Sequence, residues 1–186
     1  RHDVKARIEE FTDLAGTEHI HKGMTSRDLT ENVEQMQVRQ SLVLVRDRLV
    51  ATLARLGALA AQYTDQPLTG RSHNVAAQTT TLGKRFASAA EELITAYARL
   101  EDLIERYPLR GIKGPVGTAQ DMLDLLDGDQ ARLADLEQRV AAHLGFVEVL
   151  DSVGQIYPRS LDHDVLSALV HAAAGEGRDV DPPGRG

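Results

Sequence analysis

The sequence contains no cysteine and no tryptophan, and aromatic residues make up only 4% of its 186 residues. Without cysteine, disulfide bonds, thiolate nucleophiles and Cys-based zinc sites are excluded. No apolar run approaches the roughly 18 residues that a membrane span requires, and no signal peptide is visible. With few aromatics, the core must consist mostly of Leu, Val and Ala, which suits helices. These absences favour a helical protein of the cytoplasm.

Acidic residues outnumber basic ones, with 28 Asp and Glu against 21 Lys and Arg, for a net charge of −7 with His neutral. Such a chain is a poor candidate for DNA or RNA, whose binding depends on neutralising phosphates. The apolar share of 42% and the charged share of 26% are typical of a folded domain. We therefore expect a globular protein that binds neither nucleic acid nor membrane.

Two stripes of apolar residues at steps of three and four predict two long helices. The first begins near Ser26 and ends before Asp65, so it has roughly 35 residues, about three times the usual length. The second covers 82–107 and stops at Pro108. The stripes are Leu42, Val45, Leu49, Leu53, Leu56, Leu59 and Tyr63, then Leu82, Phe86, Ala89, Leu93, Tyr97, Leu100, Ile104 and Tyr107.

Shorter helices are expected over 119–127 and 130–143, and a last helix from Ser160 to about Ala173. No sheet is predicted, and 64–77 is expected to be a polar loop. Residues 145–159 are expected to be irregular. The predicted fold class is all-α, with long antiparallel helices of a helical bundle.

Polar and charged residues cluster in four breaks between these helices, at 1–4, 19–28, 70–81 and 111–118. Binding residues concentrate on loops held by rigid elements. The cations in or beside the breaks indicate an anionic small ligand, although solvated surface charge remains an alternative. They are Arg27, Arg71, Lys84, Arg85, Lys113 and Arg159.

Residues 73–83 combine a histidine with a run of hydroxyls at the expected head of a helix. His73 can donate a proton near neutral pH. Thr79–Thr81 would open the helix, whose free N–H groups favour an anion. The alternative is that His73 is an ordinary surface residue and Thr79 a simple helix cap.

Two further features lie ahead of the first long helix. His19 and His21 are too few ligands to specify a metal site, so we expect no metal. Residues 23–26 are either an anion-binding turn or a plain helix cap.

Five segments resemble, in order and separation, the fumarase/aspartase superfamily, and within it the adenylosuccinate lyases. The match covers positions 1 to about 170. The segments are RHDV at 1–4, HKGMTS at 21–26, GRSH at 70–73 with QTTTLGKR at 78–85, GIKGPVGT at 111–118 and QIYPR at 155–159.

The resemblance implies a β-elimination that releases fumarate from adenylosuccinate, giving AMP, and from succinyl-aminoimidazole-carboxamide ribotide, with no metal or organic cofactor. It implies that His73 is the general acid, assisted by His2. The substrate-binding residues implied are Arg1, Asp3, His21, Thr25, Ser26, Gln155 and Arg159.

The family's catalytic serine lies in a flexible loop, G-S-S-x-M-P-x-K-x-N-P, and nothing like it occurs in these residues. We therefore expect an internal piece of a longer protein that is incomplete for catalysis. Residues 1–25 would end an N-terminal region with substrate-binding loops. Residues 26–174 would form the central bundle, and the Gly/Pro-rich 175–186 a disordered tail.

The resemblance also implies a homotetramer whose active sites draw loops from three subunits. Two other functions stay open. One is another lyase of the superfamily, such as argininosuccinate lyase or a cycloisomerase, against which the HDV triplet argues. The other is a non-catalytic helical oligomerisation fragment, which the missing serine loop favours.

Overall fold

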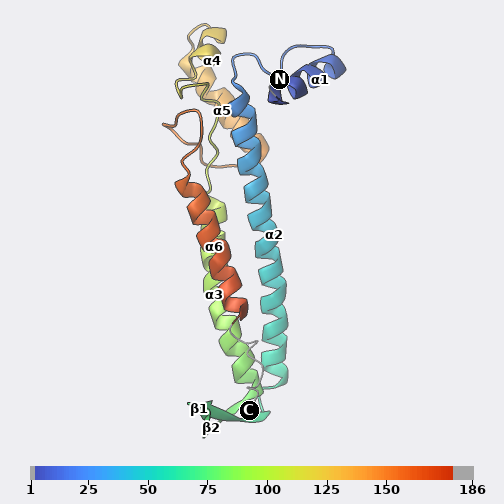
Figure 1. Cartoon of the computed structure of the whole chain (residues 1–186), viewed down its shortest axis with the longest axis vertical. Coiled ribbons are helices and arrows are strands. Elements are labelled where there is room, and N and C mark those ends of the chain that lie inside the picture. Colours follow the sequence, from blue (N-terminus) through green and yellow to red (C-terminus); the bar gives the residue numbers. More distant parts are fainter. Residues whose placement is uncertain (1–2, 178–186) are drawn as a thin grey trace. The chain divides into compact units, whose positions relative to one another are not determined.

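The computed structural model describes residues 3–177, which form six helices and one two-stranded sheet (Figure 1). The predicted helical architecture is confirmed, including both long helices and the largely irregular 145–159. None of the helices in this part of the chain is long and apolar enough to cross a membrane. The elements are α1 (Asp3–Ala15), α2 (Ser26–Gln62), β1 (Pro67–Ser72), β2 (Val75–Thr81), α3 (Leu82–Arg106), α4 (Gln120–Leu125), α5 (Gln130–Leu144) and α6 (Ser160–Gly177).

The chain divides into two compact units, which are described one at a time. Within the described residues, the first contains 3–41 and 105–161, and the second contains 42–104 and 162–177. Helix α2 therefore contributes its N-terminal part to the first unit and its C-terminal part to the second.

The second unit has an apolar core built on the two predicted stripes. Leu42, Leu49 and Leu100 are at most 3% exposed. Arg46 and Glu101 form an ion pair at 2.7 Å between α2 and α3. The rings of Tyr63 and Phe86 lie with their centroids 6.1 Å apart. Both contacts fit an antiparallel helix pair, because the residue that comes later in the α2 region contacts the residue that comes earlier in α3.

The Arg46 guanidinium is held in its charged form. Hydrogen bonds to the side chains of Glu101 and then Asp47 raise the pKa of Arg46 above its ordinary value. A pKa that is higher in the folded state than in the unfolded state stabilises the folded state at every pH below the ordinary pKa of arginine. That stabilisation is lost only as the pH rises to the raised pKa. The charge is therefore constant over the neutral range.

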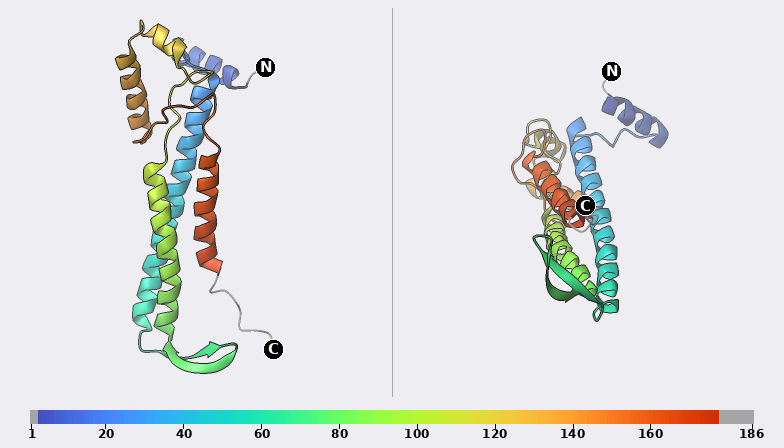
Figure 2. Two further views of the ribbon diagram at one scale, coloured as in Figure 1. Left: turned by 90° about the vertical axis from the view of Figure 1, so that its left-hand side faces the viewer. Right: turned by 60° about the horizontal axis from the view of Figure 1, so that its bottom comes forward.

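The polar loop expected over 64–77 is wrong, because residues 67–81 form an antiparallel hairpin between α2 and α3 (Figure 2). Ser72 pairs with Val75, so the turn has two residues, His73 and Asn74, with φ of 51° and 61°. Positive φ at both positions defines a type I′ turn, which matches the twist of a hairpin. A type I′ turn usually contains glycine. Because positions 73 and 74 are not glycine, the sequence shows no sign of a hairpin and no sheet was predicted.

The predicted helix start at Thr79–Thr81 is corrected in the same way. These threonines belong to β2, and α3 begins only at Leu82. Thr81 Oγ1 accepts a hydrogen bond from Lys84 N at 3.1 Å, so Thr81, and not Thr79, caps the helix.

Gly83 lies where α3 meets the end of α2. A Cβ at Gly83 would lie 2.4 Å from Ala60 O and 2.8 Å from Tyr63 C, both backbone atoms that cannot move cheaply. We expect Gly83→Ala to lower the free energy of unfolding by about 1–3 kcal/mol. Gly57, inside α2, has nothing within 4 Å of such a Cβ, so Gly57→Ala should raise it by about 0.5–1 kcal/mol. Urea denaturation of both variants checks the opposite signs; equal effects would contradict the packing described.

In the first unit, α1 was not predicted. Residues 3–15 form a helix, and Asp3 lies in its first turn and not in a loop. Asp129 caps α5 by accepting a hydrogen bond from Arg132 N at 3.0 Å. A short bridge pairs Leu109 with Val149 within otherwise irregular chain.

The last helix is longer than predicted. Helix α6 continues to Gly177, so it includes the first three residues of the predicted disordered tail. The remainder of that tail, 178–186, lies outside the described residues.

Candidate functional site

The first turns of α2 carry a buried polar stripe. Asp28, Glu31, Asn32 and Gln35 are at most 5% exposed and follow the i, i+3, i+4, i+7 spacing of one helix face. The apolar stripe that begins at Leu42 continues along the same helix. These four residues were not predicted from the sequence. The pattern that could have indicated them is polar residues at the helical spacing of a buried face, just before an apolar stripe on the same helix.

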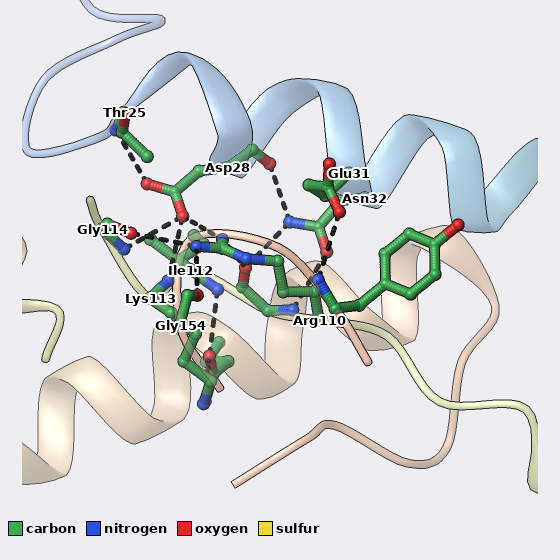
Figure 3. Close-up of polar contacts among 12 residues, drawn as sticks. Thr25, Asp28, Glu31, Asn32, Arg110, Ile112, Lys113, Gly114 and Gly154 are labelled. Carbon is green, nitrogen blue, oxygen red and sulfur yellow. Dashed lines mark hydrogen bonds and ion pairs between the residues drawn. The ribbon is translucent and has the colours of Figure 1, made fainter. Parts of the chain in front are cut away.

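Asp28 is the first residue of this stripe, and several backbone segments meet at its carboxylate (Figure 3). Its Oδ2 accepts the N–H of Thr25 at 2.8 Å, as the acid of a capping box does. Its Oδ1 accepts the N–H groups of Lys113 and Gly114, both at 3.0 Å. Arg110 Nη1 donates to the same oxygen, and both side chains are 0% exposed. A fully buried carboxylate is thus neutralised by one cation and three amides.

Arg110 links the segments around it. Its guanidinium donates to Gly111 O at 3.2 Å, Gly114 O at 2.9 Å and Gly154 O at 3.1 Å. Asn32 exchanges two hydrogen bonds of 2.9 Å with the backbone of Gly111. The glycine-rich break at 111–118 is therefore attached to α2 by side chains.

The amides of this glycine-rich break are occupied. Ile112 N donates to Glu137 Oε1 at 3.0 Å, and the next two amides donate to Asp28. Lys113, one of the cations expected to face an anionic ligand, lies 2.9 Å from the Glu137 carboxylate and is only 9% exposed. In residues 112–114, internal carboxylates take the positions that a ligand anion would take.

Glu31 holds the segment that contains Arg159. Its buried carboxylate accepts Tyr157 N at 3.1 Å and Arg27 Nη1 at 2.9 Å. Arg159 Nη2 lies 3.7 Å from Glu31 Oε1, and its guanidinium stacks 4.5 Å from the centre of the Tyr157 ring. The Arg159 side chain nevertheless remains 47% exposed, so a ligand can reach it.

Three of the predicted site residues line one pocket of about 500 Å³ in the first unit. His21, Thr25 and Ser26 meet there with residues from α1 and with Pro115 of the glycine-rich break. The pocket lies at the N-terminus of the 37-residue helix α2, where the helix dipole favours negative charge. Its full lining is Lys5, Ile8, Glu9, His21, Met24, Thr25, Ser26, Pro115 and Asp121.

His21 has one nitrogen aimed at protein and not at solvent. Its Nε2 is shielded from solvent and has no hydrogen-bond partner among residues 3–177. A shielded nitrogen without a partner is uncommon, and it lies in a side chain that lines the pocket. No group of three or more Asp, Glu or His side chains in this part of the chain is arranged to hold a metal ion.

The other predicted residues are not all in this pocket. His73 belongs to the second unit, where it is exposed in the hairpin turn. Asp3 and Gln155 are exposed in the first unit and are not part of the pocket lining. Arg1 and His2 lie outside the described residues.

The sequence matches the family described as Lyase over residues 1–174. Adenylosuccinate lyase of Saccharomyces cerevisiae is 36% identical over 176 residues, covering 94% of this chain and 36% of that protein. The protein of the same name from Schizosaccharomyces pombe is 35% identical with the same coverage, and that of Archaeoglobus fulgidus is 31% identical over 174 residues. The chain thus spans little more than a third of the length of these curated relatives.

Two solved structures share the fold. Fumarate lyase from Mesorhizobium sp. BNC1 matches 94% of this chain and 43% of its own, with a TM-score of 0.71 and 21% identity. The 3-carboxy-cis,cis-muconate lactonizing enzyme from Pseudomonas putida matches 94% of this chain and 38% of its own, with a TM-score of 0.77 and 23% identity. The helical fold described above is therefore shared with part of each of these two enzymes.

Proposed function

The chain belongs to the lyase family, and from that membership we propose that it carries part of the active site of an adenylosuccinate lyase. The reaction would be β-elimination of fumarate from adenylosuccinate, giving AMP, and from succinyl-aminoimidazole-carboxamide ribotide. The relatives of that name, from yeasts and an archaeon, support this substrate class.

The observation that carries the proposal is the pocket at the start of α2. Two hydroxyls, a half-buried histidine and the positive end of a long helix converge on it. The substrate has two carboxylates and a phosphate, and such groups are bound by hydroxyls and by the free N–H groups of a helix N-terminus. We assign His21, Thr25 and Ser26 to one of these anions. Arg159, stacked on Tyr157, is assigned to the phosphate region and Gln155 to the carboxylates.

The chemistry divides into proton removal and proton donation. A base removes the proton from the carbon next to a carboxylate, and the charge that develops spreads onto that carboxylate, where N–H and hydroxyl donors stabilise it. We assign protonation of the leaving nitrogen to His73, assisted by His2, with Arg1 and Asp3 beside the nucleotide. The base would be a serine contributed from outside these 186 residues.

We further propose a cytoplasmic homotetramer whose active sites are shared between subunits. Several large apolar side chains on the helices of the second unit are 46–66% exposed, as expected of surfaces that a partner covers. They are Leu44, Val50, Ile94, Leu166 and Val170. An active site shared between subunits would also place substrate beside His73, which is exposed in the single chain.

Fumarate release tests the proposal. Residues 3–174 would replace the matching segment of the S. cerevisiae enzyme, and the chimera would be assayed with adenylosuccinate beside the unmodified enzyme. We expect release by the chimera and none by the 186-residue chain alone, because the chain lacks the base. AMP should nevertheless raise the melting temperature of the chain alone, since ligands stabilise the state that binds them. A folded, tetrameric chimera that releases no fumarate, with no AMP effect on the chain, would overturn the proposal.

A further inference from the structure

One buried carboxylate connects two walls of the pocket. Asp28 accepts the N–H of Thr25, which lines the pocket, and the N–H of Gly114, the neighbour of Pro115, which also lines it. The two oxygens of a single side chain therefore set the spacing between the start of α2 and the glycine-rich break.

Arg110 pairs with that carboxylate and holds it in place. Because Asp28 and Arg110 are both 0% exposed, water cannot replace a contact that either side chain loses. Arg110 also donates to Gly114 O and to Gly154 O, the residue before Gln155. The pair thus joins the glycine-rich break to two segments to which the proposed function assigns substrate contacts, the Thr25–Ser26 turn and the segment that contains Gln155.

We infer that Asp28, held by Arg110, is a positioning residue that fixes the Thr25–Ser26 turn against Gly114–Pro115 and so sets the width of the anion-binding pocket. The identity of the bound anion rests on the proposed function; the coupling of the two walls rests on the hydrogen bonds alone. Asp28 touches no substrate in this scheme, and its effect is transmitted through the amides that it accepts.

Glu137 provides a matched control. Its carboxylate also holds the glycine-rich break, by accepting Ile112 N and pairing with Lys113. Within the described residues it has no hydrogen bond to the turn at 23–26. Asp28→Asn and Glu137→Gln each remove one negative charge and almost no volume, so they differ in whether the turn is involved.

The experiment is amide hydrogen exchange on the 186-residue chain. We expect Asp28→Asn to speed exchange of Thr25 and Gly114 together by about tenfold, the equivalent of one net hydrogen bond. Glu137→Gln should affect Ile112 and leave Thr25 unchanged. Arg110→Lys, a milder variant that keeps the charge, should act on Thr25 and Gly114 in the same direction if Asp28→Asn fails to fold. Unchanged exchange at Thr25 in the Asp28 and Arg110 variants, or an equal effect of Glu137→Gln there, would overturn the coupling.

A binding measurement separates positioning from stability alone. We expect the dissociation constant for AMP to rise about tenfold in Asp28→Asn and to stay within about twofold of the parent in Glu137→Gln, at a temperature where both are folded. Equal AMP affinity in all three chains would overturn the positioning role. If the parent chain binds no AMP while the exchange results hold, the proposed function fails for this chain and the coupling of the two walls stands.

Discussion

The Arg110→Met variant is expected to be about 3–5 kcal/mol less stable than the parent chain, the usual cost of breaking a buried ion pair from one side. Methionine roughly keeps the volume but leaves the fully buried Asp28 without its cation. Three backbone carbonyls, of Gly111, Gly114 and Gly154, lose a donor at the same time. Urea denaturation followed by circular dichroism measures the change in the free energy of unfolding.

Arg139→Met is the control for that experiment. Arg139 pairs with Asp135 at 2.7 Å, but its side chain is 77% exposed. A surface pair of this kind contributes about 0–1 kcal/mol, so this variant should unfold close to the parent. If both substitutions have the same small effect, the buried pair does not hold the first unit together.

The His73→Ala substitution, made in the chimera with the yeast enzyme, is expected to lower fumarate release from adenylosuccinate by a factor of about 10²–10⁴. This is the range for a general acid whose proton is needed as the carbon–nitrogen bond breaks. Added imidazole should restore part of the lost rate, because it can enter the space and donate a proton. The rate is followed as fumarate formed under saturating substrate.

His143→Ala serves as the comparison for His73→Ala. His143 is exposed in the last turn of α5 and is not part of the pocket lining. Its replacement should leave the rate and its response to imidazole unchanged. A His73→Ala chimera with the parent's rate would remove His73 from the mechanism.

The long helices could be predicted because burial repeats along them. Leu42 and Leu49 on α2, and Leu93 and Leu100 on α3, are nearly inaccessible to solvent, as the period of three and four indicates. The hairpin between these helices could not be predicted, because most of its residues are exposed and burial alternates only over the first four residues of β1. Its turn also lacks the Asn-Gly or Asp-Gly pair that marks a type I′ turn.

Only part of the candidate site follows from the sequence. The convergence of His21, Thr25 and Ser26 is local, since the three lie within six positions of each other in one turn. The role of Asp28 is not local, because its partners Arg110, Lys113 and Gly114 are 82, 85 and 86 positions away. No periodicity connects residues so distant, and only the folded chain brings Asp28 and Gly114 together.

Those separations also bear on the order of events during synthesis. Residues 42–104 can pair as neighbouring helices soon after they leave the ribosome, whereas Asp28 must wait for Gly114, with the entropy cost of closing a long loop. Until that contact forms, the unpaired face of α2 exposes polar side chains that water solvates well: Asp28, Glu31, Asn32 and Gln35. Leucines in these positions would expose an apolar surface on which other nascent chains could aggregate. A polar anchor at contacts that form this late is therefore expected to leave less apolar surface exposed while the chain is incomplete.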